Sequence, residues 1–248
     1  ASKAISAYLD LRTLNARAVS VVISQDKIIR DLKAAYTGHA AIGAALGAFS
    51  VRGVHENLGS VDIETKPNAY KGQRDYPLTD PLRDRFVSST LQNGTKYSDL
   101  SKAEIEELDK KGYVAIGNYN GYAGYFFTDS HTCMASSSDY ARIENNRVFN
   151  KAARAAREAL LPRVKSNVLK DSTTGVIASA AAKDLEGVGN AALEPMIAAG
   201  QISGAQTYID STQKIENDKA LKARVEVVFN GILHAIEIDL GLTTKLSA

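Results

Sequence analysis

Residues 139–164 carry the longest helical pattern of the chain, and this pattern constrains how the remaining segments can pack. Its apolar side chains recur at helical spacing on one face: Ile143, Val148, Ala152, Ala155, Ala159 and Leu160. Such a stripe indicates a helix that covers a sheet or a second helix with one side. Ser138 or Asp139 is expected to cap the helix, since both side chains accept hydrogen bonds from free amides at a helix N-terminus.

A second helical region and three strands complete the C-terminal half. The helical pattern covers residues 173–199, where the glycines at 187 and 189 and Pro195 predict a break or kink. Strands are expected over residues 205–210, 223–229 and 233–240. Charged residues alternate with Val or Ile in the last two: Arg224, Val225, Glu226 and Val227, then Ile236, Glu237, Ile238 and Asp239. This period of two is typical of a sheet with one solvent-exposed face.

The first half mixes short strands with helices. Residues 18–24 are rich in valine and predict a buried strand. Residues 38–49 predict a helix of small residues with one apolar face, made of Ile42, Ala45, Leu46 and Phe49. Ser101 and Glu104 have the spacing of a capping box, so a helix starts there and ends at Gly112. Two strands joined by a turn follow, at residues 113–116 and 122–128.

These elements predict an α+β fold, with a mixed sheet flanked by long helices and antiparallel strands that close the chain. A length of 248 residues fits a single domain over residues 1–248. Three prolines among polar residues predict a loop-rich excursion at about residues 60–95. Residues 242–248 follow a glycine and form a possible C-terminal arm.

Charge and cysteine content narrow the function classes. The net charge of +2 does not favour nucleic acid or a membrane surface as partner. A single cysteine, Cys133, excludes an internal disulfide and fits a reducing cytoplasm. No apolar run reaches the length of a membrane span, and the first ten residues lack a signal-peptide pattern.

The best candidate for chemistry is Asp129-x-His131-x-Cys133. On a strand these three side chains share one face, and a Cys beside a His can form a reactive thiolate pair or contribute to a metal site. Any strand produces the same alternation, however, and no second cysteine completes a metal set. We therefore predict no catalytic, cofactor-binding or metal residues and no cofactor, and we keep as the alternative an α/β small-molecule-binding enzyme that uses these three residues.

A basic face is predicted on the long helix. Arg147, Lys151 and Arg154 lie at i, i+4 and i+7, so they project from one side. Such a row is either a solvated face or an electrostatic contact with an acidic partner. The acidic cluster Glu104, Glu106, Glu107 and Asp109 is expected on an exposed helix face.

Five stretches follow one another in a recurring order: a small-residue helix at 40–57, a helix end and two strands at 108–132, a long helix opened by Asn146-Arg147-Val148 at 139–157, a strand entry at 196–210, and paired strands at 224–240. In this order they resemble the conserved core of contractile tail sheath proteins of phages, tailocins and related injection systems. The chain departs from that pattern where the family has a tryptophan, since Tyr125 or Phe126 stands there, and at Val148, which replaces a second arginine.

The resemblance implies a structural subunit, not an enzyme, that polymerises helically around an inner tube and contracts to drive it through a cell envelope. The implied partners are further copies of the chain, the inner tail tube protein, and baseplate and tail-end cap proteins, with no nucleic acid and no membrane insertion. The implied location is a virion tail or tailocin-like particle assembled in the bacterial cytoplasm. Candidate tube contacts are Lys214, Lys219, Lys222 and Arg224. Candidate C-terminal arm residues, which would add a strand to a neighbouring copy, are Leu242, Thr243, Thr244, Lys245 and Leu246.

Overall fold

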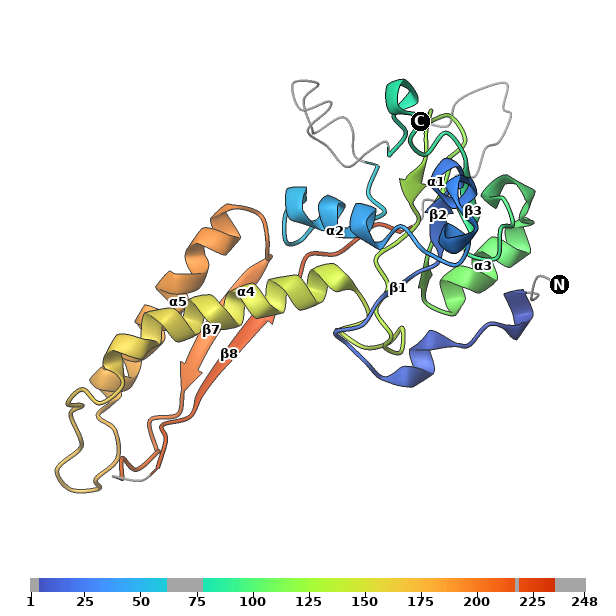
Figure 1. Ribbon diagram of the computed structural model, residues 1–248. Coiled ribbons are helices and arrows are strands. Elements are labelled where there is room, and N and C mark those ends of the chain that lie inside the picture. Colours follow the sequence, from blue (N-terminus) through green and yellow to red (C-terminus); the bar gives the residue numbers. More distant parts are fainter. Residues whose placement is uncertain (1–4, 62–77, 217–218, 235–248) are drawn as a thin grey trace, which may run out of the picture.

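The computed structural model describes residues 5–61, 78–216 and 219–234. These residues form two parts, which we call the head (residues 5–142) and the arm (residues 143–229) (Figure 1). The head holds two apolar clusters, and the arm holds two others. The α+β class predicted from the sequence is confirmed. The prediction of a single domain stays a prediction.

The head is built on three short two-stranded sheets. The valine-rich segment forms two strands, β1 (Val21–Val22) and β2 (Ser24–Asp26), where the sequence predicted one. The remaining strands are β3 (Ser89–Leu91), β4 (Tyr113–Val114), β5 (Ile116–Gly117) and β6 (Phe126–Phe127). β1 pairs with β4 in parallel, whereas β2 with β3 and β5 with β6 are antiparallel.

Helix α2 (Ile42–Val51) packs through its smallest side chains. Ala45 and Ala48 are buried in the cluster that contains Phe127, whereas Ile42 and Leu46 are 57% and 65% exposed. The predicted apolar face, which included Ile42 and Leu46, was therefore wrong at these two positions. The alanine side lets the helix backbone lie close to the strands, and the larger residues are left outside.

Two further helices complete the head. Helix α1 (Lys27–Leu32) starts at Asp26, whose carboxylate accepts from the Ile28 amide. Helix α3 (Lys102–Lys110) has the predicted capping box, because Ser101 and Glu104 satisfy each other's backbone amides. Gly112 follows with φ of 82°, a left-handed conformation that favours glycine and ends the helix.

Helix α4 (Ile143–Leu160) begins later than predicted. Its N-cap is Arg142, without a side-chain cap, so the predicted capping by Ser138 or Asp139 was wrong. The reason lies in the segment before the helix, which pairs with the chain after β6 instead of coiling. The Thr132 amide donates to the Ala141 carbonyl at 3.0 Å, and Arg142 forms an isolated β-bridge with His131.

Helix α5 (Ser179–Ala198) runs unbroken through its glycines, so the prediction of a break near residues 187–189 was wrong, and the alternative of a kink there stays a prediction. Gly189 serves packing: a Cβ there would lie 2.5 Å from the Thr207 Oγ1. Glycine therefore lets α5 lie directly on the sheet of the arm. Pro195 is accommodated in the last turn of the helix.

The arm's sheet is an antiparallel ribbon of two strands, β7 (Gly204–Ile209) and β8 (Ala223–Val228). Strand β8 alternates as predicted, with Arg224 and Glu226 exposed, and β7 alternates as well, with Thr207 and Ile209 buried and Tyr208 exposed. Helix α5 packs on β7 and against α4 (Figure 1). The predicted third strand at 233–240 lies almost entirely outside the described residues. No helix among the described residues is long and apolar enough to cross a membrane.

Candidate functional site

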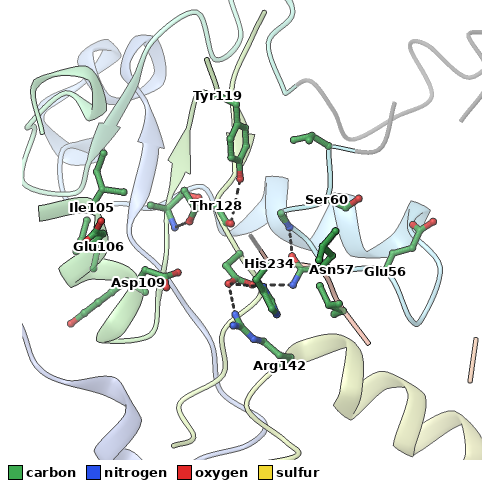
Figure 2. Close-up of a pocket in the computed structure, with 18 of the residues that line it drawn as sticks. Glu56, Asn57, Ser60, Ile105, Glu106, Asp109, Tyr119, Thr128, Arg142 and His234 are labelled. Carbon is green, nitrogen blue, oxygen red and sulfur yellow. Dashed lines mark hydrogen bonds and ion pairs between the residues drawn. The ribbon is translucent and has the colours of Figure 1, made fainter. Parts of the chain in front are cut away.

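A cavity of about 1180 Å³ opens in the head beside the start of the arm. Its wall includes residues of α3, the loop after α2 and the segment 231–234 that returns from the arm. Figure 2 shows Asn57 and Arg142 reaching the same spot from different elements, near His234. Asp129 lies at that spot and also lines the cavity.

Asn57 is held in place by the loop that carries it. The Arg52 guanidinium is buried and donates to the Asn57 carbonyl and to the Leu58 carbonyl, the latter at 2.6 Å. Gly59 lets this loop run against the neighbouring chain, since a Cβ at position 59 would lie 2.6 Å from the Thr128 carbonyl oxygen. The Asn57 side chain is thereby fixed against the segment that follows β6.

The Asn57 amide joins three acceptors from two parts of the chain. Its Nδ2 lies 2.9 Å from Asp129 Oδ1, 2.8 Å from Ser130 Oγ and 3.0 Å from Glu144 Oε1. The Ser130 hydroxyl in turn contacts the other oxygen of Glu144. Because Glu144 lies in the first turn of α4, this cluster ties the arm to the head.

The two buried carboxyl groups of the cluster have opposite electrostatics. Burial raises the pKa of Glu144 above its ordinary value, and hydrogen bonds from Ser130 and Asn57 offset this only in part. Burial also acts to raise the pKa of Asp129, but the Arg142 guanidinium and the hydrogen bonds from Asn57 and the Ser130 amide outweigh it, so that the pKa is lowered. Arg142 forms an ion pair with Asp129. The surroundings therefore favour the ionised form more strongly at Asp129 than at Glu144.

His131 is fully buried and its proton position follows from its neighbours. The guanidinium groups of Arg142 and Arg12 lie 2.7 and 3.3 Å from Nδ1. Since guanidinium only donates, Nδ1 accepts, and the ring proton is on Nε2, which donates to Asp109 Oδ1 at 2.6 Å. His131 therefore links α3 to the segment before α4.

Asp109, Asp129 and His131 also bring three potential metal-ligand atoms within 4.8 Å of one another. A metal on Nε2 requires the ring proton to move to Nδ1, which faces the two guanidinium groups. In metal sites that nitrogen usually donates to an acceptor. The arrangement therefore fits a hydrogen-bonded ion-pair network better than a metal centre.

Of the three residues singled out in the sequence, the structure joins two. His131 Nε2 lies 3.6 Å from Asp129 Oδ2. Cys133 instead packs in an apolar cluster of the head with Leu11 and Leu91, where burial raises the pKa of its thiol. A raised thiol pKa opposes formation of a nucleophilic thiolate. Asn57, Asp109, Arg142 and Glu144 were missed as partners because their contacts join segments that are distant in sequence.

The basic residues of α4 differ in their surroundings. Arg147 is committed to the head: its guanidinium donates to the carbonyls of Phe49, Arg52 and Gly53 at 2.9–3.2 Å and lies over the Phe49 ring. These carbonyls are at the C-terminal end of α2, where a cation is favourable. Lys151 bonds to Gln201 Oε1 at 2.6 Å, and Arg154 is exposed.

The four candidate tube contacts lie at the far end of the arm. Lys214, Lys219, Lys222 and Arg224 all line one shallow hollow of about 560 Å³. Lys219 pairs with Glu216 and Arg224 with Glu226, each at 2.6 Å. The sequence prediction therefore identified a cluster in space. The C-terminal arm residues 242–246 lie outside the described residues.

Comparison with known proteins gives a family. The chain matches the DUF2586 N-terminal domain over residues 1–131 and the DUF2586 C-terminal domain over residues 139–247. No curated protein matches it. One similar solved chain comes from the "anti-feeding prophage (AFP) baseplate, 6-fold symmetrised", with 16% identity and a TM-score of 0.47. The match covers 71% of this chain and 48% of that chain, so this chain spans about half of its length. A likeness at this level indicates no function.

Proposed function

We propose that this chain, which belongs to the DUF2586 family, is a structural subunit of a contractile injection system and, within it, a sheath subunit that polymerises helically around an inner tube. On this proposal the subunit is not an enzyme, and the polymer contracts to drive the tube through a cell envelope. The ordered series of segments that resembles contractile tail sheath proteins motivates the assignment.

The observation that carries the proposal is the β7–β8 ribbon. Among the described residues it is a sheet of two strands only, and β8 has an outer edge without a partner strand. The outer edge of β7 is bonded to α5 instead, because the amides of Thr207 and Ile209 donate to Asn190 Oδ1 and Glu186 Oε1. One face of the ribbon is covered by α5, and the other carries exposed side chains such as Tyr208 and Val228. Two-stranded sheets are marginal by themselves, and open edges accept further strands. A strand added by a neighbouring copy would enlarge the sheet and pair with its open edge.

The junction of head and arm also suits a polymer subunit. Asn57 and Ser130 bind Glu144 at the start of α4, and Arg147 binds the end of α2 one turn later. These contacts hold the arm at a fixed angle to the head. A subunit of fixed shape transmits movement between its contacts with neighbours, which contraction of a polymer requires.

The basic hollow of the arm supports an acidic protein partner. Lys214, Lys219, Lys222 and Arg224 present cations on one surface, as contacts to an inner tube would require. Single exposed ion pairs contribute about 0–1 kcal/mol, which suits a surface that must release during contraction. Baseplate and cap proteins are the further partners on this proposal.

The enzyme alternative receives less support from the same geometry. Asp129 lines a cavity, as an active-site residue would need to. His131, however, is fully buried, and its ring nitrogens are hydrogen-bonded to arginines and to Asp109. Cys133 packs among apolar residues. These groups are arranged to hold α3, the loop after α2 and α4 together.

Electron microscopy of the purified full-length chain tests the proposal. We expect hollow, helically striated cylinders, alone or when mixed with the tube protein. Particles that remain small and discrete at every concentration tested, with or without tube protein, would overturn it.

A further inference from the structure

The loop after α4 has an unusual surface. Residues 161–170, which we call the tip loop, read Leu-Pro-Arg-Val-Lys-Ser-Asn-Val-Leu-Lys. Leu161, Val164 and Leu169 are 59%, 62% and 75% exposed. Single exposed apolar residues are ordinary, but three within nine positions form a patch that marks interaction sites. The tip loop lies at the end of the arm that is farthest from the head (Figure 1).

Basic side chains are interleaved with this apolar patch. Arg163 pairs with Asp184 at 3.1 Å, and Lys170 donates to the Ile215 carbonyl at 2.7 Å. Lys165 is exposed and forms no hydrogen bond or ion pair with any residue that the structure describes. Its φ of 66° is in the left-handed region, which is uncommon for a lysine and costs conformational energy. The tip loop thus presents an unpaired cation between apolar side chains.

The head cavity offers the complementary chemistry. Its described lining includes four carboxylates (Glu56, Glu106, Asp109 and Asp129) against two cations (Lys110 and Arg142). Tyr97, Tyr119 and Tyr122 also line it and give it aromatic surface. Glu106 is exposed at the cavity wall on α3, and its ion pair with Lys102 is long, at 3.9 Å. Aromatic rings and carboxylates together are suited to a lysine flanked by apolar side chains.

The two surfaces cannot meet within one molecule. They lie on opposite parts of the chain, separated by the arm (Figure 1). Helix α4 alone has 18 residues and therefore spans roughly 27 Å at about 1.5 Å per residue. The complementary surfaces on one rigid chain are therefore available only to other copies.

We infer that the tip loop of one copy docks in the head cavity of a second copy, with Lys165 facing Glu106 and with Val164 and Leu169 against the tyrosines. This inference rests on the proposed function, since it names a contact that builds the polymer. Two different patches meet in it, so the contact is heterologous and repeats from copy to copy without closing, unless the rotation forms a ring. It leaves the basic hollow at Lys214–Arg224 available for another partner.

A pair of charge reversals tests the contact. Lys165→Glu and Glu106→Lys are each expected to raise the concentration at which polymer appears by about tenfold, which equals about 1.4 kcal/mol. An equimolar mixture of the two variants is expected to restore assembly, because the altered tip of one fits the altered head of the other while the second contact is unchanged. Lys33→Glu, an exposed reversal outside both surfaces, is the matched control. Thermal melting checks that each variant folds.

The apolar part of the contact has its own variant, Leu169→Ser. It is expected to weaken assembly about tenfold without lowering the melting temperature. Single variants that assemble as readily as the control, or a mixture that assembles no better than either variant alone, would overturn the inference while leaving the polymer proposal intact.

Sedimentation equilibrium separates failure of this contact from failure of the proposed function. Self-association between tip loop and head cavity can be lost in each variant and restored by mixing without ever producing cylinders. That result supports the contact and contradicts the sheath proposal. A full chain that does not self-associate contradicts both. A third outcome is that the chain binds vesicles of phosphatidylglycerol and that Lys165→Glu abolishes this binding while self-association is unchanged. This outcome assigns the loop to a membrane surface and overturns the contact.

Discussion

Replacing Asn57 by alanine probes the connection between head and arm. The substitution removes one amide that serves three acceptors, at Asp129, Ser130 and Glu144. Asp129 Oδ1 retains the Ser130 backbone amide as a donor at 2.7 Å, and Ser130 retains its contact with one oxygen of Glu144, so Glu144 Oε1 loses most. The Glu144 carboxyl is buried, which prevents water from replacing the lost donor.

The expected cost follows from that burial. A buried polar group left without its partner costs about 1–3 kcal/mol, which is the expected cost at Glu144 Oε1. This is a substantial part of the roughly 5–15 kcal/mol that stabilises a typical folded protein. For a chain of this length it corresponds to a fall in melting temperature of about 2–12 °C.

Urea unfolding and thermal melting of the full chain measure the effect. The matched control is Asn93→Ala, because Asn93 Oδ1 accepts from the Thr95 amide just as Asn57 Oδ1 accepts from the Gly59 amide. The control removes this local bond without touching a buried carboxylate. A free energy of unfolding for Asn57→Ala within about 0.5 kcal/mol of the control would refute the account of the buried network.

Four other outcomes are expected. A carboxyl group whose pKa is raised on folding stabilises the folded state below its unfolded pKa and loses that contribution as pH rises through the folded pKa. Glu144→Gln should therefore be more stable than the natural chain at neutral pH, with the difference vanishing in acid. Urea unfolding at several pH values checks this, and a stability difference that does not change with pH contradicts it. Cys133→Ala should leave assembly intact, and loss of a measurable hydrolase or transferase activity in this variant would refute the structural assignment. Charge reversal at Lys214 and Lys219 should weaken co-assembly with the tube protein but spare polymers of the chain alone, and equal loss of both contradicts the tube assignment. Deleting residues 242–248 should leave a folded, soluble monomer that polymerises poorly. Sedimentation and thermal melting of this variant test the prediction. Unchanged polymerisation excludes an arm, and loss of the melting transition places the segment in the core of the subunit.

Local signals in the sequence predicted the elements that depend on local chemistry. The capping box at Ser101 and Glu104 was confirmed because its bonds lie within one turn of helix. The alternation in β8 was confirmed because one face of the ribbon is covered by α5. In both cases neighbours within a few residues, or a simple period, carry the information.

The incorrect predictions from the sequence concern positions where tertiary contacts determine the local structure. Residues 139–142 have a helical pattern, but they form a turn that ends in a bridge between Arg142 and His131, and α4 starts at Ile143. Gly189 was interpreted as a helix breaker, whereas it makes room for Thr207. The partners of Asp129 and His131 come from residues 12, 57, 109 and 142, and no spacing in the sequence connects these positions.

The position of the buried network bears on how a polymer of this chain can change shape. Arg147 and Glu144 fasten the first turns of α4 to the head, and Leu193 and Met196 of α5 pack against the same helix farther along. Bending the chain at the junction would separate two carboxyl groups and an arginine from their hydrogen-bonding partners at the same time. The proposed contacts between copies, at the outer edge of β8 and at the tip loop, involve exposed groups, which exchange with water at much lower cost. On the proposed function, contraction therefore moves rigid subunits relative to one another, and the head–arm angle stays the same in both states.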